Sequence, residues 1–379
     1  MNVTAESLSV SEHIKLGLLS EGLAISPSAQ DYIDARNANR PMTPADYAST
    51  SGIILRIDGS NWVNAPIALY NPNFVDHPGY LLDLGDNGLV VTGEGLEATA
   101  EFWLPPDYHG KTNEHGEAYN SYAFTHGDRV RVSPIEGCAM HCHFCDLPYE
   151  FKYRTKRIEG IVDSVQVALT DPLQRAGHVL ISGGTPHEED FDYVQQCYQA
   201  VITGFAPVPV DIMMVPAPGL LDVEWLASIG VHQLSINLEI YDATLARRIM
   251  RRKAELTQAA YLDFIEHATT VLGAGRVRSM LMVGVEPLES TLLGVRAIAE
   301  RGGVPVLSPF RPDPSTPMAK ALPPTSAVLR EAYLRAREIA IAVGSDLGPD
   351  CLPCSHNTLT FAQDGIGTAF RAYRDPVLV

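Results

Sequence analysis

Along residues 129–343, short runs of apolar residues alternate with longer segments in which apolar residues recur at helical spacing. The apolar runs predict strands at 129–135, 178–184, 210–217, 232–240, 277–287 and 304–310. The longer segments predict helices at 158–171, 188–204, 220–229, 242–272 (in two pieces), 288–302 and 325–343. Near-continuous apolar strands separated by helices indicate a parallel sheet with βαβ crossovers. Six such units predict an α/β fold, namely a partial (β/α)6 TIM-like barrel.

The segments on either side of this barrel follow different patterns. Residues 4–22 and 27–37 predict helices, and an aromatic segment rich in Gly, Pro and Asn follows them. That segment contains three short predicted strands, IILRID (53–58), PIALY (66–70) and GLVVTG (88–93). The C-terminal end has too many turn residues to add another barrel helix. We therefore expect an N-terminal α+β cap over residues 1–125, a barrel core over 126–345 and a loop-rich C-terminal extension over 346–379.

The composition is that of a globular protein, since 46% of the residues are hydrophobic and 19% are charged. The formal net charge of −17 argues against DNA or RNA as a partner, because nucleic-acid binding needs a basic surface. No run of about 18 apolar residues is present, so we expect no membrane-spanning helix. The first residues lack the basic and apolar blocks of a signal peptide, and we expect a cytoplasmic location.

Three of the six cysteines, Cys138, Cys142 and Cys145, lie directly after the first predicted barrel strand, in the sequence GCAMHCHFCDLPY. In barrels of parallel strands, catalytic groups lie at the carboxyl ends of the strands. A four-iron cluster is usually held by four thiolates, so three thiolates on one loop leave one iron open to a ligand that takes part in the reaction. The alternative is a zinc site completed by His141 or His143, although neighbouring donors in so short a loop chelate a tetrahedral ion poorly.

The spacing Cx3Cx2C at this place in a barrel resembles the cysteine loop of the radical S-adenosylmethionine (radical SAM) superfamily. Phe144, directly before the third cysteine, matches the aromatic residue that lies against the adenine in that family. The segment SGGTP after the second predicted strand resembles the glycine-rich segment whose backbone meets the methionine amino group. It supplies Ser182, Gly183, Gly184 and Thr185, and Thr185 stands where many family members have Glu.

Later strand ends extend the resemblance over residues 126–345. In the sequence SINLE, Asn237 and Glu239 are suited to the ribose hydroxyls or the methionyl group of SAM. The segment MVGVEP, with Gly284 and Glu286, resembles the family segment whose backbone pairs with adenine. Arg252 belongs to a basic group after the fourth predicted strand, and its planar guanidinium suits the SAM carboxylate.

The resemblance implies an enzyme with a [4Fe-4S] cluster and S-adenosylmethionine as cofactors. Reductive cleavage of SAM would give a 5′-deoxyadenosyl radical that abstracts hydrogen from a small polar or anionic metabolite. Fragmentation, rearrangement or cyclisation in a biosynthetic pathway would follow. Such a radical has to be kept from water, which makes residues 1–125 a candidate lid. The alternative for this region is a purely structural cap or an oligomer interface.

A looser resemblance comes from SPFRPDPSTPM (308–318), after the sixth predicted strand. Together with the fifth strand it is similar to the branch that contains biotin synthase, the tyrosine lyase of thiamine synthesis and the hydrogenase maturation enzymes. The cap and the C-terminal extension depart from those members, so their substrates are not carried over. Arg311 is a candidate for binding an anionic substrate, and the alternative is a salt bridge to Asp313.

Cys351 and Cys354 form a second pair in the sequence GPDCLPCSHN. Three roles are open: an auxiliary iron–sulfur cluster with a third ligand such as His356, a thiol that exchanges a hydrogen atom with the substrate, and inert packing. The first role makes radical sulfur insertion the alternative reaction. A non-enzymatic alternative is an iron–sulfur or zinc-binding protein. The last cysteine, Cys197, lies in a helical pattern and is predicted to be a core residue.

A basic group follows the cysteine loop and consists of Lys152, Arg154, Lys156 and Arg157. A one-electron donor such as flavodoxin or ferredoxin is acidic and would be steered to such a group. The alternative is an ordinary solvated surface. The partners predicted from the sequence are therefore a small-molecule substrate and an electron donor.

Overall fold

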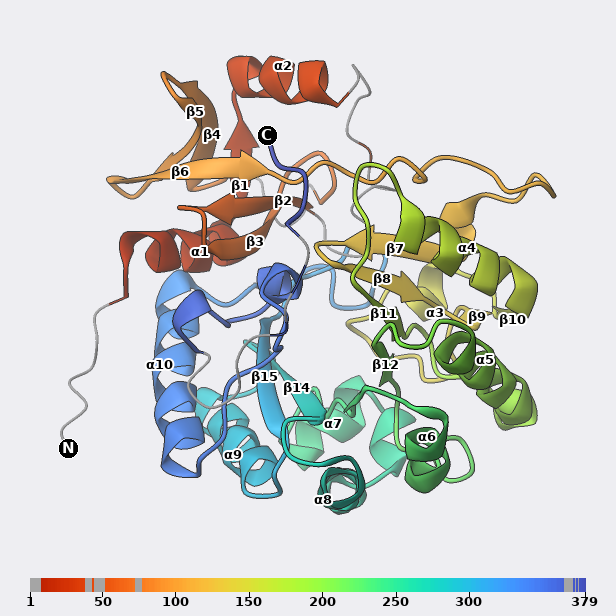
Figure 1. Ribbon diagram of the computed structural model, residues 1–379. Helices are drawn as coiled ribbons and strands as arrows, with labels where there is room; N and C mark the ends of the chain where they lie inside the picture. Colours follow the sequence, from red (N-terminus) through yellow and green to blue (C-terminus); the bar gives the residue numbers. More distant parts are fainter. Residues whose placement is uncertain are drawn as a thin grey trace.

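The structure is a computed structural model that describes residues 8–37, 43, 52–71, 77–364, 371, 373 and 375–379. These residues form two large β-sheets, one of six strands and one of seven. Figure 1 shows the six-stranded sheet, in red to orange, above a curled seven-stranded sheet that carries helices on its outer side. The fold is mixed α/β, as predicted.

The seven-stranded sheet is the predicted partial barrel. Its parallel strands, in spatial order, are β8 (Arg129–Val132), β11 (His178–Ile181), β12 (Val210–Met213), β13 (Gln233–Ser235), β14 (Val277–Val283) and β15 (Val304–Pro309). An antiparallel strand, β7 (Ala123–His126), lies beside β8. The helices are α4 (Ile158–Thr170), α5 (Phe191–Gly204), α6 (Val223–Ile229), α7 (Ala243–Ile249), α8 (Gln258–Leu272), α9 (Leu288–Ala299) and α10 (Ser326–Ala342). Each falls on a predicted segment, and the partial (β/α)6 fold is confirmed.

The N-terminal part is an α+β unit, also as predicted. It contains α1 (Val10–Glu21), β1 (Leu23–Ile25), α2 (Pro27–Arg36), β2 (Gly52–Ile57), β3 (Asn61–Pro66), β4 (Tyr80–Gly85), β5 (Gly88–Gly93) and β6 (Leu96–Phe102). The sheet order is β1-β4-β5-β6-β2-β3. The helix α1 begins at Val10 because Ser9 and Glu12 form a capping box. The first residues of the predicted helix, 4–7, lie outside the described residues.

The prediction of a strand at PIALY is wrong beyond its first residue. The strand β3 ends at Pro66, which lies opposite Gly52, the first residue of β2. The chain then turns, and Tyr70 N donates to Ile67 O at 3.0 Å. The strand on this stretch is NWVNAP, whose six residues are all buried, so the alternating pattern expected of a half-exposed strand is absent.

The open side of the partial barrel lies between its two edge strands, β7 and β15. The C-terminal segment covers it from the β15 side, where Leu359 N donates to Leu307 O at 2.9 Å. The short helix η5 (Pro353–Asn357) lies against the β7 side, since a Cβ on Gly127 would lie 2.6 Å from Pro353 O. Strand β3 packs on η5 as well. The N-terminal unit and the C-terminal segment therefore close the side that the strands leave open.

Contacts between the two ends of the chain complete this closure. In β6, Phe102 exchanges backbone hydrogen bonds with Val379, at N–O distances of 2.6 and 3.0 Å. The buried Lys15 of α1 donates to Ser355 O and Thr360 O, at 3.2 and 2.6 Å. Burial lowers the pKa of Lys15 to about 7. The first helix, the N-terminal sheet and the C-terminal segment thus form one packed unit.

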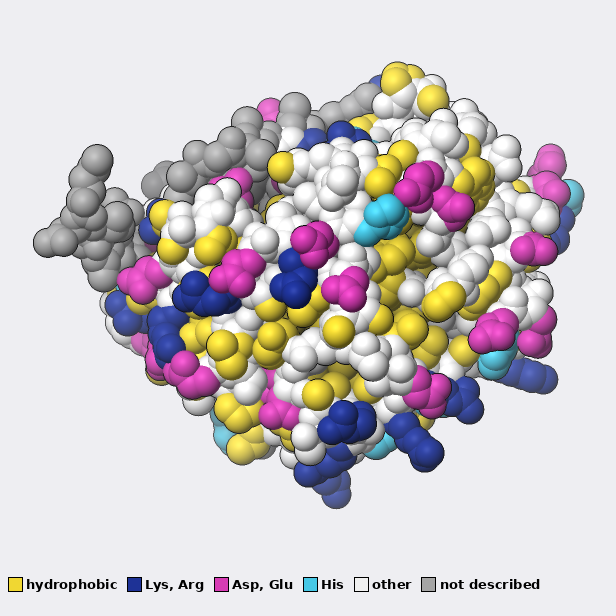
Figure 2. Space-filling view, turned by 90° about the horizontal axis from the view of Figure 1, so that it is seen from below, with side chains coloured by type: hydrophobic (Ala, Val, Ile, Leu, Met, Phe, Trp, Pro, Cys, Tyr) yellow, Lys and Arg dark blue, Asp and Glu magenta, His cyan; other side chains and the backbone are white. Residues whose placement is uncertain are grey.

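The surface mixes charges of both signs. On the face shown in Figure 2, acidic and basic side chains are interspersed, with apolar side chains visible between them. This face has no uniformly basic surface of the kind that nucleic-acid binding needs. Within the described residues, none of the helices has the length and apolar character required to cross a membrane.

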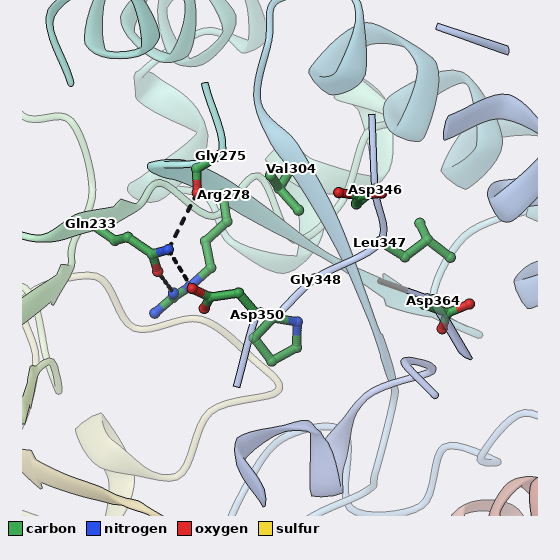
Figure 3. A pocket seen from close by; sticks show the side chains of 10 residues that line it. Gln233, Gly275, Arg278, Val304, Asp346, Leu347, Gly348, Asp350 and Asp364 are labelled. Atoms are coloured by element: carbon green, nitrogen blue, oxygen red, sulfur yellow. Dashed lines mark hydrogen bonds between the residues drawn. The ribbon is translucent and has the colours of Figure 1, made fainter. Parts of the chain in front are cut away.

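A buried polar network fills the amino-terminal end of the barrel. Asp211 of β12 lies 3.4 Å from Arg278 Nη2 and 3.2 Å from Arg371 Nη2. Figure 3 shows the adjoining pocket, where Gln233 lies between Arg278 and Asp350. The Gln233 amide donates to the Asp350 carboxylate at 2.9 Å. Because Asp350 belongs to the C-terminal segment, this network ties that segment to the strands.

Replacing Asp211 by Asn should destabilise the protein strongly. Burial alone would raise the pKa of Asp211, but His232, Arg278 and Arg371 hold it well below its usual range. Removing one partner of a buried ion pair costs about 3–5 kcal/mol, and we expect such a loss in urea unfolding at pH 7. Since the folded-state pKa is depressed, the stabilisation is present above the unfolded-state pKa of about 4 and declines below it.

The difference between wild type and Asp211→Asn should accordingly shrink as the pH is lowered below about 4. The matched control is Asp86→Asn, because Asp86 is exposed in the turn between β4 and β5. Its effect should stay within about 0.5 kcal/mol. Equal losses in the two variants would contradict a special role for the buried network.

Candidate active site

The cluster loop, residues 137–146, connects β9 (Ile135–Glu136) to α3 (Leu147–Glu150) at the carboxyl end of the first parallel strand. Gly137 has a φ of 72°, and a Cβ there would lie 3.0 Å from Phe151 O, so the loop has to begin with glycine. Cys142 is buried, and Cys138 and Cys145 are half-buried. Burial raises the pKa of the Cys142 thiol to about 12. Binding of a metal group would therefore have to displace its proton.

The spacing of the three thiols fits a cluster better than a single ion. Two ligands of one zinc ion lie about 2.0–2.3 Å from it, so they cannot be more than about 4.6 Å apart. Among the described residues, only His178, Cys351 and Cys354 form a group of three potential ligand atoms within 4.8 Å of one another. His141 and His143, the donors of the zinc alternative, are exposed. The three thiols of the cluster loop are thus not among the groups compact enough for one ion, and a [4Fe-4S] group held by these cysteines stays a prediction.

The glycine-rich segment predicted to meet SAM lies directly against the cluster loop. Gly184 approaches so closely that a Cβ would lie 1.8 Å from Gly137 O and 2.8 Å from Cys138 Cα. Thr185 O accepts from Ala139 N at 2.9 Å, and Thr185 N donates to Cys138 Sγ at 3.2 Å. Met140 N also donates to Cys138 Sγ, at 3.3 Å. Two backbone amides thus donate to this sulfur and hold it against the glycine-rich segment.

The start of the same segment follows β11 closely. Ser182 is buried, and its backbone N donates to Val132 O at 2.8 Å, which continues the pairing of β11 with β8. Gly183 has a φ of 118°, a conformation that side chains rarely allow. The four predicted residues, Ser182 to Thr185, are therefore placed beside the cysteine loop, whereas their contact with SAM remains a prediction.

A buried ion pair follows the fourth parallel strand. Glu239 has a φ of 65°, and its carboxylate lies 3.1 Å from Lys253 Nζ. Burial acts to lower the pKa of Lys253, but the charge of Glu239 raises it above its usual value. The neighbouring Arg252 donates to Ala139 O in the cluster loop at 2.7 Å. Lys253, which sequence reasoning did not select from its basic group, thus joins Glu239 and Arg252 near the cysteines.

The remaining predicted SAM contacts divide into two kinds. Phe144 is half-buried and packs in an apolar group with Ile240, Ala246, Ile249, Met250, Met282 and Phe310, a setting suited to an aromatic base. The polar atoms of the others have protein partners. Asn237 Oδ1 accepts from Met280 N at 3.2 Å. The Glu286 carboxylate accepts from Tyr241 N and Asp242 N, at 3.1 and 2.6 Å.

The hydrogen bonds from Tyr241 N and Asp242 N show that Glu286 secures the loop after β13. Gly284, two residues before Glu286, has a φ of 101°. A Cβ on Gly284 would lie 2.8 Å from Pro324, so this position is closely packed. A role of Gly284 and Glu286 in binding adenine stays a prediction. It would have to use backbone atoms, as the resemblance implies.

Arg311, a candidate for substrate binding, ties the N-terminal unit to the barrel. It donates to Asn64 Oδ1 and Asn64 O, at 2.9 and 2.6 Å. Burial lowers the pKa of Arg311 to about 9. Since Asn64 lies in β3 and Arg311 follows β15, these bonds help to hold β3 over the open side of the barrel.

The second cysteine pair lies at the other end of the barrel. Cys354 Sγ is 3.6 Å from Nε2 of His178, the first residue of β11. The cluster loop, in contrast, contacts the segment that follows the last residue of β11. His356 was suggested from the sequence as a third ligand beside Cys351 and Cys354. Its Nδ1 lies 2.7 Å from Pro353 O, within hydrogen-bonding distance. No local motif marks His178, because it lies 173 residues before Cys351 along the chain. Cys197 is buried in α5, as predicted.

A cavity of about 410 Å³ lies beside the cluster loop. Its lining includes Gly137, Asp146 and Leu147 of the loop region, Gly183 and Gly184, and Asn120, Tyr122 and Phe124 before and within β7. Two half-buried cations, Arg131 and Lys156, also line it. Burial lowers the pKa of both, that of Lys156 to about 8. The alternation RVRV in β8 was a usable sequence signal for Arg131, because it places both arginines on the face opposite the buried valines.

The structure places the three cysteines of the loop at the carboxyl ends of the strands of a partial barrel, where catalytic groups lie in such folds. The sequence model of the radical SAM superfamily matches residues 132–290, from the end of β8 into α9. Residues 132–290 thus match a radical SAM domain, which confirms the resemblance predicted from the sequence and supports the prediction of an enzyme. The family implies a [4Fe-4S] cluster and SAM as cofactors.

Solved structures give weaker likenesses. The FeFe-hydrogenase maturase HydG from Carboxydothermus hydrogenoformans is 15% identical, with 59% of this chain and 54% of that chain covered and a TM-score of 0.46. A radical SAM methyltransferase from Sphaerobacter thermophilus is 14% identical, with 75% and 82% covered and a TM-score of 0.46. The match spans about half the length of the HydG chain. No curated protein matches the sequence.

Replacing Gly184 by Ala should prevent assembly of the cluster. The added methyl group would overlap Gly137 O and push the cluster loop away from its position. After anaerobic reconstitution we expect iron and sulfide to fall at least about fivefold below the wild-type content. The matched control is Gly204→Ala at the end of α5, where a Cβ would meet nothing within 4 Å. Normal iron content in the Gly184 variant would show that the close approach is dispensable.

Proposed function

We propose that the protein uses a 5′-deoxyadenosyl radical to abstract hydrogen from a small polar metabolite that carries an anionic group. The cavity beside the cluster loop carries this proposal, because it shares Gly137, Gly183 and Gly184 with the cysteine site and is lined by two half-buried cations. When bound, the cluster and SAM would supply the electron and the radical. Rearrangement, fragmentation or cyclisation of the substrate would follow.

The residues of this chain would bind and orient the reactants. Cys138, Cys142 and Cys145 would hold the cluster, and the two amides that donate to Cys138 Sγ would keep this sulfur in position. Lys253 and Arg252, at the same end of the barrel, are suited to the carboxylate of SAM. Phe144 and its apolar neighbours would pack against the adenine of SAM.

The substrate would lie with its anionic group toward Arg131 and Lys156. Both cations are half-buried in the cavity wall, where charge-assisted hydrogen bonds would stabilise a carboxylate or phosphate. Asp146 and Glu150 line the same cavity and offer acceptors for hydroxyl or amino groups. Tyr122 and Phe124 supply apolar walls that exclude water. Their position before and within β7 supports a contribution of the N-terminal region to the substrate pocket.

Radical sulfur insertion is less well supported by the geometry. The carbon that loses hydrogen would have to reach a sulfur at Cys351 or Cys354, at the opposite end of the strands. β11 has four residues, which at about 3.3 Å each separate its two ends by roughly 10 Å. Arg131 of β8 is paired in register with Leu180, which lies between the first and last residues of β11. About four irons per chain would favour the leading proposal, and seven or eight would favour sulfur insertion.

The proposal can be tested by anaerobic reconstitution followed by incubation with SAM and dithionite. We expect 5′-deoxyadenosine to form slowly with the protein alone and at least about tenfold faster with a fraction of small anionic metabolites that contains the substrate. Arg131→Met should keep the slow reaction and lose most of the stimulation, whereas Cys142→Ser should lose both. Arg131→Lys should restore part of the stimulation.

Absence of 5′-deoxyadenosine under every condition would contradict the proposed reaction. Undiminished stimulation of Arg131→Met would instead leave the reaction standing and refute the assignment of the cavity. The two outcomes are therefore distinguishable. Iron content serves as the check that each variant still carries its cluster.

We also propose that an acidic flavodoxin or ferredoxin docks beside the cluster loop. Two cations of the basic group are paired, since Arg154 lies 2.5 Å from Glu136 and Arg157 lies 2.7 Å from Glu117. Lys152 is exposed and next to α3. It is therefore the best single position at which to test steering of a negatively charged donor.

Lys152→Glu should slow reduction of the protein by flavodoxin several-fold at low ionic strength, with a smaller effect at high salt. Reduction by dithionite should be unchanged, because this small reductant does not need the docking surface. The measurement is the rate of bleaching of the cluster absorbance. Equal slowing with both reductants would mean that the substitution damages the cluster rather than the docking.

A further inference from the structure

A buried group of three potential metal ligands lies at the amino ends of the barrel strands, away from the cluster loop. It consists of His178 from β11 and of Cys351 and Cys354 at η5, each with an exposed fraction of 4% or less. All three ligand atoms lie within 4.8 Å of one another. We propose that this group binds one zinc ion that fastens the C-terminal segment to the barrel.

The distances suit a single ion. Thiolate sulfur and imidazole nitrogen bind zinc at about 2.3 and 2.0–2.1 Å, and a tetrahedral angle then places them about 3.6 Å apart. The distance between Cys354 Sγ and His178 Nε2 is 3.6 Å. The two sulfurs are 2.7 Å apart, about 1 Å closer than two thiolates on one zinc, and a small rotation about the Cα–Cβ bond of either cysteine opens this distance.

A four-iron cluster is a poorer fit to the same residues. Such a cluster binds each thiolate to a different iron, so its ligands lie further apart than those of one ion. The compact group at Cys351 and Cys354 contrasts in this respect with the cluster loop, whose thiols do not form such a compact group. The two sites in one chain therefore have different donor geometries.

Asp128 provides a second, independent indication. Its Oδ2 lies 3.4 Å from Nδ1 of His178, the ring nitrogen that does not face the sulfurs. Histidine ligands of zinc commonly donate their other ring N–H to a carboxylate, which fixes the tautomer and orients the ring. Asp128 is buried, and a Cβ on Gly177 would lie 2.5 Å from its Oδ2, so the carboxylate is held in place from the side of the strand.

The charges of the three ligands suit a buried zinc ion. Two thiolates and a neutral imidazole leave a zinc ion with no net charge, which limits the cost of burial. The three donors leave one position of a tetrahedral ion for a water molecule or another ligand. Among the described residues no fourth His, Cys, Asp or Glu completes the group.

The proposed ion would join segments that are distant along the chain. Gly348 N donates to Pro305 O at 3.0 Å and Leu359 N to Leu307 O at 2.9 Å, so backbone bonds hold the C-terminal segment to β15 on either side of the cysteines. The bond from zinc to His178 would hold the same segment to β11. Since η5 also packs on β3, the ion would stabilise the closure of the open side.

The test is to measure zinc and iron in the full chain, produced with zinc in the medium and reconstituted anaerobically. We expect about one zinc per chain beside the iron of the cluster loop. The double variant Cys351→Ser/Cys354→Ser should hold less than about 0.1 zinc per chain with its iron unchanged. Cys197→Ser, which removes a buried cysteine elsewhere, should keep its zinc.

A milder variant keeps the proposal testable if the double variant does not fold. Asp128→Asn should retain the fold and release zinc to a competing chelator at an affinity about 10–100-fold weaker than wild type. Limited proteolysis should then cut residues 346–361 faster after zinc is removed.

Three results would overturn the proposal. One is a wild-type protein without zinc, and another is zinc that is retained by the double variant. The third is a Cys351–Cys354 disulfide, or iron and sulfide that disappear with these two cysteines. Because 5′-deoxyadenosine formation is measured separately, failure of the zinc site would leave the proposed function untouched.

Discussion

The whole active site depends on the close approach of two backbone segments at the carboxyl ends of β8 and β11. Gly184 and Gly137 touch without room for a side chain, and the hydrogen bonds of Thr185 with Ala139 and Cys138 fasten the two segments together. For the three sulfurs to hold one cluster, as we propose, the loop that carries them has to be fixed in position, and these contacts fix it. The parallel pairing of β8 with β11 brings the segments to the same level, so the barrel architecture and the metal site follow from one constraint.

A six-stranded partial barrel has a second problem, which is its open side. Exposed strand edges invite pairing with other chains, and the radical of the proposed reaction would have to be kept from water, so this side needs a cover. This chain closes the gap with β3 and η5, which come from opposite ends of the sequence. Polar links such as Arg311 to Asn64 and Gln233 to Asp350 fix these pieces in place. The closure leaves the cavity beside the cluster loop at one end of the strands and the cysteine pair at the other.

The barrel strands, their helices and the cysteine loop could be predicted because each is encoded locally, by apolar runs and by the spacing of cysteines. The prediction of a strand at PIALY was wrong because β3 is buried on both faces, so no alternation of apolar and polar residues marks where this strand ends. His178 and Lys253 were missed for another reason. His178 lies beside Cys354 and Lys253 pairs with Glu239 only in the folded protein. No local sequence pattern predicts such a pairing. The position of Arg131 could in principle have been predicted, since the RVRV alternation places it on the face of β8 opposite the buried valines.

The contact of Lys15 with Ser355 and Thr360 has a consequence for how the protein is made. The partners of Lys15 are encoded 340 and 345 residues later, so they do not exist when α1 leaves the ribosome. At about 5–20 residues per second, α1 waits roughly 20–70 s for them during synthesis. A shorter delay of roughly 14–55 s applies to Phe102, because its backbone partner Val379 comes 277 residues later. Until then the Lys15 ammonium and the backbone groups of Phe102 have to be satisfied by water instead of by their partners in the folded protein.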